Sequence, residues 1–343
     1  MGYEILDMKK LIVLIFVLFL CKLCAIAQTI NVAFTIDKNY PIFTCLAINS
    51  IVKNSSEDFK FYIIESDLSN QDKKMMRNFV SKRNQQIEFI NINTDNIDFG
   101  KKLFGRITPI AIARIAIPDL LPNDVHRVIY LDSDILVTGD LKNLYNTDLK
   151  NYSVAMGLDN SYGHDGYFMF KKKDGYYNSG VILMDLDKLR KDKASEKMQT
   201  FLHDNIKKFI LDESHEKYYR YSDQDLINIV LSGKIKTLSK NWNNQSVHLF
   251  IMAPLTDSGI IHFIGPDKPW DFNNKSKLAK GNKEYMKNWM STELWPYKFL
   301  YVLKSYKEKF YKEKSFIKRK ICRYKEFLKK ISNLRKEQIN GKI

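Results

Sequence analysis

The sequence predicts an α/β protein with a mostly parallel sheet and helices on both of its faces. Short apolar segments alternate with longer amphipathic segments from Ile30 onward, which is typical of strands joined by helical crossovers. The segment Val128–Val137 is apolar on both alternating sides apart from its centre, as expected of a strand buried on both faces of a parallel sheet.

The predicted elements follow one another without long gaps. Pro41 suits the first turn of a helix over 41–55, Ser69 is a candidate N-cap for a helix over 71–82, and Ser222 is one for a helix over 223–231. A further helix is expected over 110–120. Strands are expected at 30–35, 59–64, 87–92, 128–137, 153–157, 180–186, 235–238 and 259–265.

Composition divides the chain into three parts. Residues 1–28 form an apolar segment that resembles a signal or anchor, residues 29–296 form the globular domain, and residues 297–343 form a basic tail. The 343 residues are 45% apolar, which is enough for a substantial core. The four cysteines form neither a disulfide framework nor a zinc-binding pattern with nearby histidines.

The charge is concentrated in the tail. Residues 298–343 hold 16 Lys and Arg against four Glu, a net of +12, so the preceding 297 residues carry only +4 of the total +16. Aromatic and aliphatic residues recur among these lysines at helical spacing, which predicts a basic amphipathic helix on an anionic membrane surface. A helix packed on its own domain is the alternative. RNA ranks third, because the body carries no nucleic-acid motif and we expect no nucleic-acid partner.

Two aspartates interrupt the apolar segment Val128–Val137. For one Asp, a turn would be the ordinary explanation. Asp132 and Asp134, however, point to the same side of an extended chain, and no Lys or Arg lies between Val128 and Val137. Their mutual repulsion near a core favours a hard cation between them, Mg²⁺ or Mn²⁺. The end of a buried strand is also where open α/β sheets bind ligands.

Three further polar clusters stand beside predicted strands or at a helix start. Asn178 precedes a buried strand and could bind hydroxyl groups. Asp223 and Gln224 begin a helix, where capping is the simpler explanation for any single acid. His262 follows an apolar strand; a structural role is the simpler explanation there, but a third metal ligand would favour Mn²⁺ over Mg²⁺. Gly265 and Lys268 suit a phosphate. Together these groups suit a nucleotide-sugar.

The motifs resemble those of glycosyltransferase family 8, a family of retaining enzymes with the GT-A fold. The resemblance covers about residues 30–270 and rests on "AFTIDKNY", "IAIARIAIPDLLP", "VIYLDSDILV", "YYNSGVILMDL", "YSDQDLIN" and "IHFIGPDKPW" in that order. The chain is similar to bacterial lipopolysaccharide galactosyl- and glucosyltransferases. It departs from them in its N-terminal segment and in Lys38, where an acid is frequent.

The resemblance implies a role for each matching position. Asp132, Asp134 and His262 would hold Mn²⁺, with Mg²⁺ as the alternative. Thr35 and Ile36 would flank the uracil of a UDP-sugar, Asp37 and Asn39 would contact uridine and ribose, Ser133 would line the nucleotide through its backbone, and Gly265 and Lys268 would hold the diphosphate. Arg114, Asn178, Asp223 and Gln224 would contact the donor sugar, UDP-galactose or UDP-glucose, with Gln224 nearest the reacting face.

The expected reaction is retaining transfer of a hexose to a glycan or glycolipid, such as lipopolysaccharide core or another cell-surface glycan. An amide such as Gln224 is a poor nucleophile, which favours front-face attack by the acceptor over a covalent adduct on Asp223. A catalytically silent nucleotide-sugar-binding protein of the same fold is the alternative. A nucleotidyltransferase is a third hypothesis, against which "HFIGPDKPW" argues.

The first 28 residues complicate the expected location. Lys9 and Lys10 precede the apolar run, and the positive-inside rule would place the following domain across the membrane. A bacterial enzyme that uses UDP-sugars is expected in the cytoplasm. We therefore expect the cytoplasmic face of a bacterial inner membrane, with the segment either lying at the membrane or preceding the true start. The lumen of a secretory pathway is the alternative.

Overall fold

The computed structural model describes residues 28–92, 109–159, 175–205, 222–245, 259–265, 268–271 and 280–297. The chain divides into two compact units, 1–262 and 263–343. The apolar segment and the basic tail predicted from the sequence lie outside the described residues, apart from Gln28 and Tyr297. Within the described part of the chain, no helix is both long enough and apolar enough to cross a membrane.

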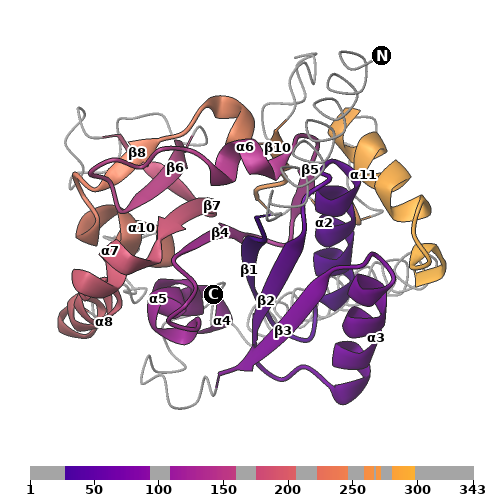
Figure 1. Cartoon of the computed structure of the whole chain (residues 1–343), viewed down its shortest axis with the longest axis horizontal. Helices are drawn as coiled ribbons and strands as arrows, with labels where there is room; N and C mark the ends of the chain where they lie inside the picture. The colour runs from indigo at the N-terminus through magenta and orange to yellow at the C-terminus, as the bar shows by residue number, and fades with distance from the viewer. Residues whose placement is uncertain are drawn as a thin grey trace, which may run out of the picture. The chain divides into compact units, whose positions relative to one another are not determined.

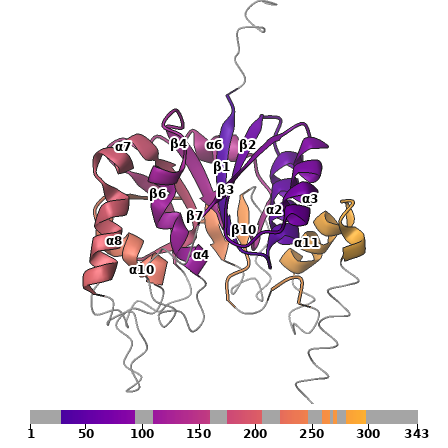
Figure 2. The same cartoon turned by 90° about the horizontal axis from the view of Figure 1, so that it is seen from below.

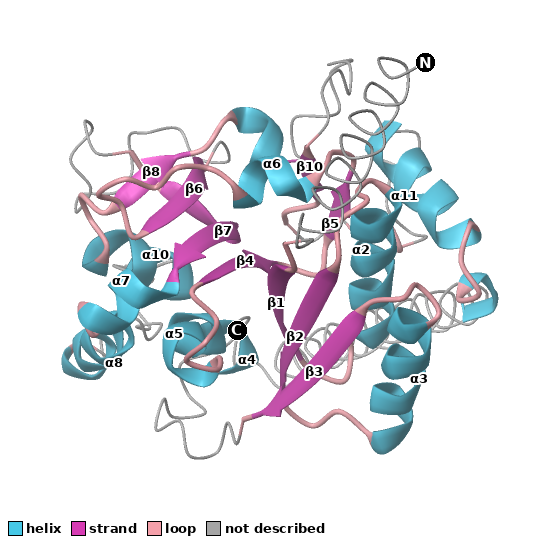
Figure 3. Ribbon diagram, viewed as in Figure 1, coloured by secondary structure: helices cyan, strands magenta, loops and turns pink. Residues whose placement is uncertain are grey.

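A seven-stranded sheet forms the centre of the first unit, with the strand order β3-β2-β1-β4-β7-β6-β8. The strands are β1 (Ile30–Ile36), β2 (Phe59–Glu65), β3 (Gln86–Asn91), β4 (Arg127–Leu131), β6 (Val154–Leu158), β7 (Tyr177–Asp185) and β8 (Ile235–Thr237). All neighbours pair in parallel except β7, which is antiparallel to both β4 and β6. The predicted mostly parallel sheet is therefore confirmed (Figure 3).

Helices cover both faces of this sheet, as the sequence predicted. Figure 1 shows α2 and α3 on one face and α4, α5, α8 and α10 on the other, and Figure 2 shows the same two groups from below. In the described part of the first unit, the helices are α2 (Pro41–Lys53), α3 (Asn70–Ser81), α4 (Pro109–Ile112), η1 (Ala113–Ala116), α5 (Ile117–Leu120), α6 (Leu141–Tyr145), α7 (Leu186–Lys191), α8 (Ala194–Asp204), α10 (Ser222–Val230) and η2 (Lys240–Asn243).

Apolar residues of the sheet pack against the second group of helices to form a large core. Tyr130, Met156 and Ile182 of the strands pack in one buried cluster with Met198 of α8 and Leu226 of α10. Removing such side chains from water contributes about 1.5–3 kcal/mol each. The helix ends are satisfied locally: Ser69 caps α3 in a capping box with Asp72, as its position in the sequence predicted.

A small second sheet in the same unit has the order β5-β10-β9. It consists of β5 (Ile135–Val137), β9 (Asn244–Gln245) and β10 (Ile260–His262). The sequence predicted a buried strand with the aspartates at its C-terminal end, and β4 does end at Leu131. The apolar residues after the aspartates belong to a separate strand, because the chain leaves the central sheet and β5 pairs antiparallel with β10. This change of sheet places Ile135 opposite His262.

The helix predicted over 110–120 is three short pieces. Pro118 has no N–H to donate to the Arg114 carbonyl four residues earlier. That carbonyl instead accepts from Ile117 N–H, which closes the 3₁₀ turn η1, and α5 restarts with Pro118 in its first turn. The interruption keeps Arg114 in a tight, buried turn beside the edge of β1 and β4.

The second unit contains α11 (Lys280–Met290). Tyr285 and Trp289 of this helix are fully buried, and Trp289 Nε1 donates a hydrogen bond to the carbonyl of Leu294 at 2.9 Å. The rings of Phe263 and Trp270 pack against Tyr285, with centroid distances of 5.4 and 5.7 Å. Aromatic packing therefore defines this small core.

Candidate active site

The candidate site lies at one edge of the central sheet. The parallel strands β1, β4 and β6 end at this edge, while β7 starts there because it runs in the opposite direction. Asp132 therefore follows the end of β4, and Asn178 and Ser179 are the second and third residues of β7. The sequence placed Asn178 in a turn before its strand; the structure corrects this, because β7 begins three residues earlier than expected.

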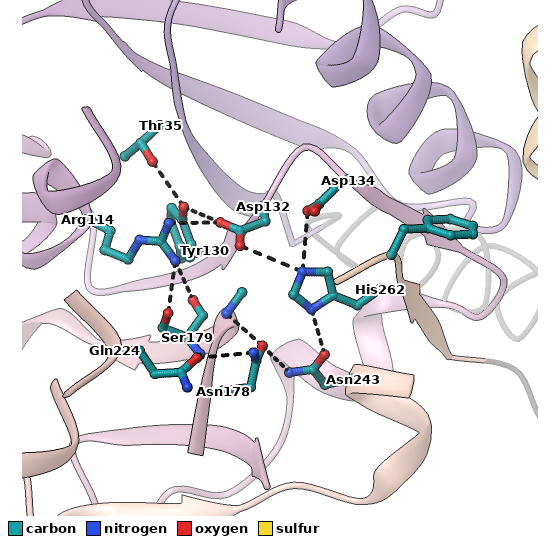
Figure 4. Close-up of polar contacts among 12 residues, drawn as sticks. Thr35, Arg114, Tyr130, Asp132, Asp134, Asn178, Ser179, Gln224, Asn243 and His262 are labelled. Atoms are coloured by element: carbon teal, nitrogen blue, oxygen red, sulfur yellow. Dashed lines mark hydrogen bonds and ion pairs between the residues drawn. The ribbon is translucent and has the colours of Figure 1, made fainter. Parts of the chain in front are cut away.

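Asp132, Asp134 and His262 form one cluster, as the sequence predicted. One potential ligand atom of each residue lies within 4.8 Å of those of the other two. His262 Nε2 is 3.3 Å from Asp134 Oδ1 and 3.7 Å from Asp132 Oδ2 (Figure 4). The pairing of β10 with β5 creates this cluster, because it carries His262 across 128 residues of chain to the turn that holds the two aspartates.

The geometry of the cluster fits a divalent cation. Ligands at 2.0–2.1 Å from an ion lie about 3 Å apart when they are neighbours in an octahedron, close to the two distances from His262. Space is provided by Gly180, because a Cβ at this position would overlap the His262 ring and lie 2.8 Å from Asp132 Oδ2. Two carboxylates with one imidazole suit Mn²⁺ well.

The orientation of His262 also fits a metal ligand. Its Nδ1 lies 2.9 Å from Asn243 Oδ1. The Asn243 Nδ2 group is itself a donor to Asn178 Oδ1 at 2.9 Å, so Asn243 Oδ1 must be the acceptor and His262 Nδ1 carries the proton. In this tautomer the other ring nitrogen, Nε2, faces the two aspartates, as a metal-binding histidine requires.

Arg114 links the two sides of the site. Its guanidinium pairs with Asp132 Oδ1 at 3.1 Å and with Asp223 Oδ2 at 3.2 Å, and it donates to the carbonyl and hydroxyl of Ser179 at 3.0 and 3.1 Å. Arg114 of η1 thus supplies part of the positive charge that the two neighbouring aspartates require. Asp132 Oδ1 also accepts from Tyr130 Oη at 2.6 Å, which leaves Oδ2 toward His262.

Burial and charge shift the pKa values of these groups. Burial lowers the pKa of Arg114, but Asp132 and Asp223 outweigh it and the pKa rises, so the guanidinium stays charged. Burial raises the pKa of Asp223, Arg114 lowers it and Asp132 raises it, with a net increase. Burial also raises the pKa of Tyr130 well above its usual value, so it remains a donor to Asp132.

Gln224 is held in place by hydrogen bonds to Asn178, Ser179 and Asp159. Its Oε1 accepts from Asn178 Nδ2 at 3.1 Å and from the Ser179 amide at 3.0 Å, and its Nε2 donates to Asp159 Oδ2 at 2.8 Å. The side chain is 6% exposed. Asp159 was not predicted from the sequence. It directly follows strand β6, just as Asp132 directly follows β4, and an acidic residue at a strand end is the signal that identified Asp132.

The positions expected to contact the nucleotide cluster at the end of β1 and the start of α2. Thr35 Oγ1 lies 3.0 Å from Tyr130 Oη, and Asp37 Oδ1 accepts from the Asn39 amide at 2.8 Å. Ile36 is buried, and the buried Ser133 hydroxyl lies 2.8 Å from Thr44 Oγ1. Burial, then Asp134, Asp37 and Asp132, raises the pKa of the neighbouring Tyr40 to about 12.

Gly265 and Lys268 belong to the second unit. Gly265 has φ +81°, a left-handed conformation that favours glycine. Lys268 Nζ donates to the Phe263 carbonyl at 2.7 Å. Their assignment to a diphosphate stays a prediction.

The chain is similar to several proteins over most of its length. It is 28% identical over 268 residues to General stress protein A of Bacillus subtilis, covering 73% of this chain and 90% of that one. It is 25% identical over 303 residues to a lipopolysaccharide 1,2-glucosyltransferase of Escherichia coli, covering 82% and 85%. A "Probable galacturonosyltransferase-like 4" of Arabidopsis thaliana is 24% identical over 274 residues, covering 71% and 74%.

The fold is also that of solved glycosyltransferases. A crystal structure of the galactosyltransferase LgtC with donor and acceptor sugar analogues superimposes with a TM-score of 0.65, 21% identity, and coverage of 78% of this chain and 100% of the other. This likeness confirms the GT-A fold. The family pattern described as "Glycosyl transferase family 8" matches residues 31–274. The chain therefore belongs to glycosyltransferase family 8.

Proposed function

We propose that this chain is a retaining hexosyltransferase that moves galactose or glucose from a UDP-sugar to a glycan acceptor, with Mn²⁺ as its metal and Mg²⁺ as the alternative. The observation that carries the proposal is the position of two polar groups at one edge of the sheet. The cluster of Asp132, Asp134 and His262 suits a diphosphate-bound cation, and the buried amides Asn178 and Gln224 beside it suit sugar hydroxyls. Arg114 connects the two groups.

The described residues support a mechanism without a covalent sugar adduct. When bound, Mn²⁺ would act as a Lewis acid that stabilises negative charge on the leaving UDP. The nearest side chain expected at the reacting carbon is Gln224, whose oxygen already accepts two hydrogen bonds and which is a poor nucleophile. Asp223 is held by Arg114 and by the Ser179 hydroxyl. Both observations favour attack by the acceptor itself.

In this mechanism, the acceptor oxygen bonds to C1 on the face from which UDP departs. The bond between C1 and the phosphate oxygen breaks, and the acceptor proton passes to that oxygen. Lys268 is proposed to act as a fixed cation that stabilises the negative charge developing on the leaving UDP. Thr35, Ile36, Asp37, Asn39 and Ser133 are proposed to bind the uridine.

The proposed acceptor is lipopolysaccharide core or another cell-surface glycan. The E. coli relative named as a lipopolysaccharide 1,2-glucosyltransferase supports this choice, since it aligns over most of both chains. The net charge of +12 over 298–343 also suits work at an anionic surface. We propose the cytoplasmic face of a bacterial inner membrane, with the first 28 residues lying at the membrane or preceding the true start.

UDP release from a panel of UDP-sugars, with and without Mn²⁺, tests the function. We expect release from UDP-galactose or UDP-glucose only when the metal is present. Release of pyrophosphate from a nucleoside triphosphate instead would indicate a nucleotidyltransferase. Binding of UDP-sugars without any turnover, across a set of glycan acceptors, would indicate a silent nucleotide-sugar-binding protein.

Two separate experiments test the location. Removing residues 297–343 should release the protein from anionic vesicles while transfer to a soluble acceptor persists, since each basic residue contributes about 1 kcal/mol near such a surface. Equal vesicle binding with and without the tail would reject the tail proposal. N-terminal sequencing with protease treatment of spheroplasts tests the first segment: a mature N-terminus at Gln28 and a domain digested from outside would place the enzyme on the other side.

A further inference from the structure

Asn243 lies directly behind the metal cluster, against His262. It ends the 3₁₀ helix η2, and its side chain is 2% exposed. Its Oδ1 accepts from His262 Nδ1 at 2.9 Å and its Nδ2 donates to Asn178 Oδ1 at 2.9 Å (Figure 4). One side chain thus touches both a predicted metal ligand and a predicted sugar-binding amide.

The backbone around Asn243 makes room for this arrangement. A Cβ on Gly157 of β6 would lie 2.8 Å from Asn243 Cβ, which is closer than real side chains approach. Gly180 of β7 serves His262 in the same way. Two glycines on neighbouring strands therefore allow Asn243 and His262 to lie side by side against the sheet. Ser239 fixes the start of η2, since its hydroxyl accepts from the Asn241 amide.

The chemistry of the position requires an amide. His262 Nδ1–H needs an acceptor, and Asn178 Oδ1, which already accepts from the Gly180 amide at 3.0 Å, takes its second hydrogen bond from Asn243. A carboxylate at position 243 would offer only the acceptor and an ammonium only the donor. The hydrogen bonds continue from Asn178 Nδ2 to Gln224 Oε1 and from Gln224 Nε2 to Asp159 Oδ2. Asn243, Asn178 and Gln224 form a connected amide row that starts at His262.

We propose that Asn243 is a positioning residue that fixes His262 with Nε2 toward the metal and aligns the sugar-binding amide Asn178 with it. The inference rests on the proposed metal site and deepens it. If Asn243 were absent, His262 could take the other tautomer or rotate, and Nε2 would no longer point to Asp132 and Asp134. Groups that orient a metal-binding histidine in this way affect metal affinity about 10- to 100-fold.

The test uses the full chain with UDP and Mn²⁺ as the probe. Mn²⁺ affinity is measured from the loss of the free-ion electron paramagnetic resonance signal, and electron spin echo modulation by ¹⁴N reports imidazole bound directly to the ion. The variants are Asn243→Ala and Asn243→Asp. Asn49→Ala is the matched control, because Asn49 of α2 is also a buried amide, 8% exposed, and its Oδ1 accepts from Arg83 Nε at 2.9 Å.

Asn243→Ala is expected to weaken Mn²⁺ binding about 10- to 100-fold and to reduce the ¹⁴N modulation. Asn243→Asp should keep both, because its carboxylate still accepts from Nδ1–H. It should nevertheless slow hexose transfer about 10-fold, because it cannot donate to Asn178 Oδ1. The control should match the wild type in metal affinity and modulation.

Each contrary result has a distinct meaning. Wild-type Mn²⁺ affinity and ¹⁴N modulation in Asn243→Ala would overturn the inference. If Asn243→Ala does not fold, Asn243→Asp decides. Loss of the ¹⁴N modulation in Asn243→Asp would overturn the role of Asn243 toward His262. An unchanged rate of hexose transfer in Asn243→Asp would overturn the link to Asn178. A wild-type protein that binds Mn²⁺ without ¹⁴N modulation would reject the proposed metal site itself.

Discussion

Two groups of residues meet at the same edge of the sheet, and they are held there in different ways. The strand-end group, Asp37, Asp132 and Asp134, follows the ends of the parallel strands β1 and β4. The amide row, Asn243, Asn178 and Gln224, comes from η2, from the start of the antiparallel strand β7 and from α10. The first group is placed by strand ends and held by Arg114 and Tyr130 on Asp132, whereas the second is placed by hydrogen bonds between its own side chains.

The two groups have different requirements. Strand ends bring the aspartates to a common edge, which is where open α/β sheets bind ligands. The proposed contact with sugar hydroxyls needs amides at fixed angles, and hydrogen bonds within the protein fix the side chains of the row. His262 joins the two groups, since it faces the aspartates with Nε2 and the amide row with Nδ1.

The largest effect is expected from the strand-end group. Asp134→Ala removes a proposed metal ligand and should lower Mn²⁺-dependent kcat at least about 10³-fold, because several kcal/mol of charge stabilisation are lost. The fold should persist, since the change also removes one of two like charges. Steady-state kinetics and thermal unfolding measure the two effects, and normal turnover would exclude Asp134 as a ligand.

Arg114 tests the connection between the two groups. Arg114→Gln should cost about 3–5 kcal/mol of stability, because it leaves the buried Asp223 without its partner. Loss of the guanidinium raises the pKa of Asp223 further, so the folded state holds a proton that the unfolded state releases above about pH 4. The penalty should therefore be small near pH 4 and grow as the pH rises.

Chemical denaturation between pH 4 and pH 8 measures this penalty. Arg114→Gln combined with Asp223→Asn should recover part of the lost stability at pH 8, since the buried charge is removed with its partner. If the loss of stability in Arg114→Gln is independent of pH and is not relieved by Asp223→Asn, the charge of Asp223 is not stabilised by Arg114.

Much of the fold and half of the site followed from the sequence. Apolar runs and helix caps located the strands and helices, and aspartates at a strand end indicated the metal cluster. The sequence did not show that β7 is antiparallel, because a strand buried on both faces has the same composition in either direction. It also missed Asn243 and Asp159, whose roles depend on contacts across 65 residues of chain with Asn178 and Gln224.

Gly180 tests the packing between β7 and the cluster. Gly180→Ala should weaken Mn²⁺ binding about 10- to 100-fold, because a methyl group would displace His262 and approach Asp132 Oδ2. Isothermal titration with Mn²⁺ in the presence of UDP measures the change. Unchanged affinity would mean that the cluster can shift away from β7 without losing its geometry.

The smallest effect is expected for Asp37, which would bind the substrate equally well in the ground state and in the transition state. Asp37→Ala should raise KM for the UDP-sugar about 10-fold and leave kcat nearly unchanged, because a contact with uridine would be equal in the ground and transition states. The amide row should behave in the opposite way, with losses in kcat. An equal fall in kcat for Asp37→Ala would place Asp37 in the reaction itself.

One metal ion is expected to bind Asp132 and Asp134 of the strand-end group together with His262, which the amide row holds in place. Crystals grown with UDP and Mn²⁺, with data collected at a wavelength where manganese scatters anomalously, test it most directly. We expect one anomalous peak within about 2.3 Å of an oxygen of Asp132, an oxygen of Asp134 and Nε2 of His262. A peak that contacts the two aspartates while His262 turns away, or no peak at this edge, would contradict the claim.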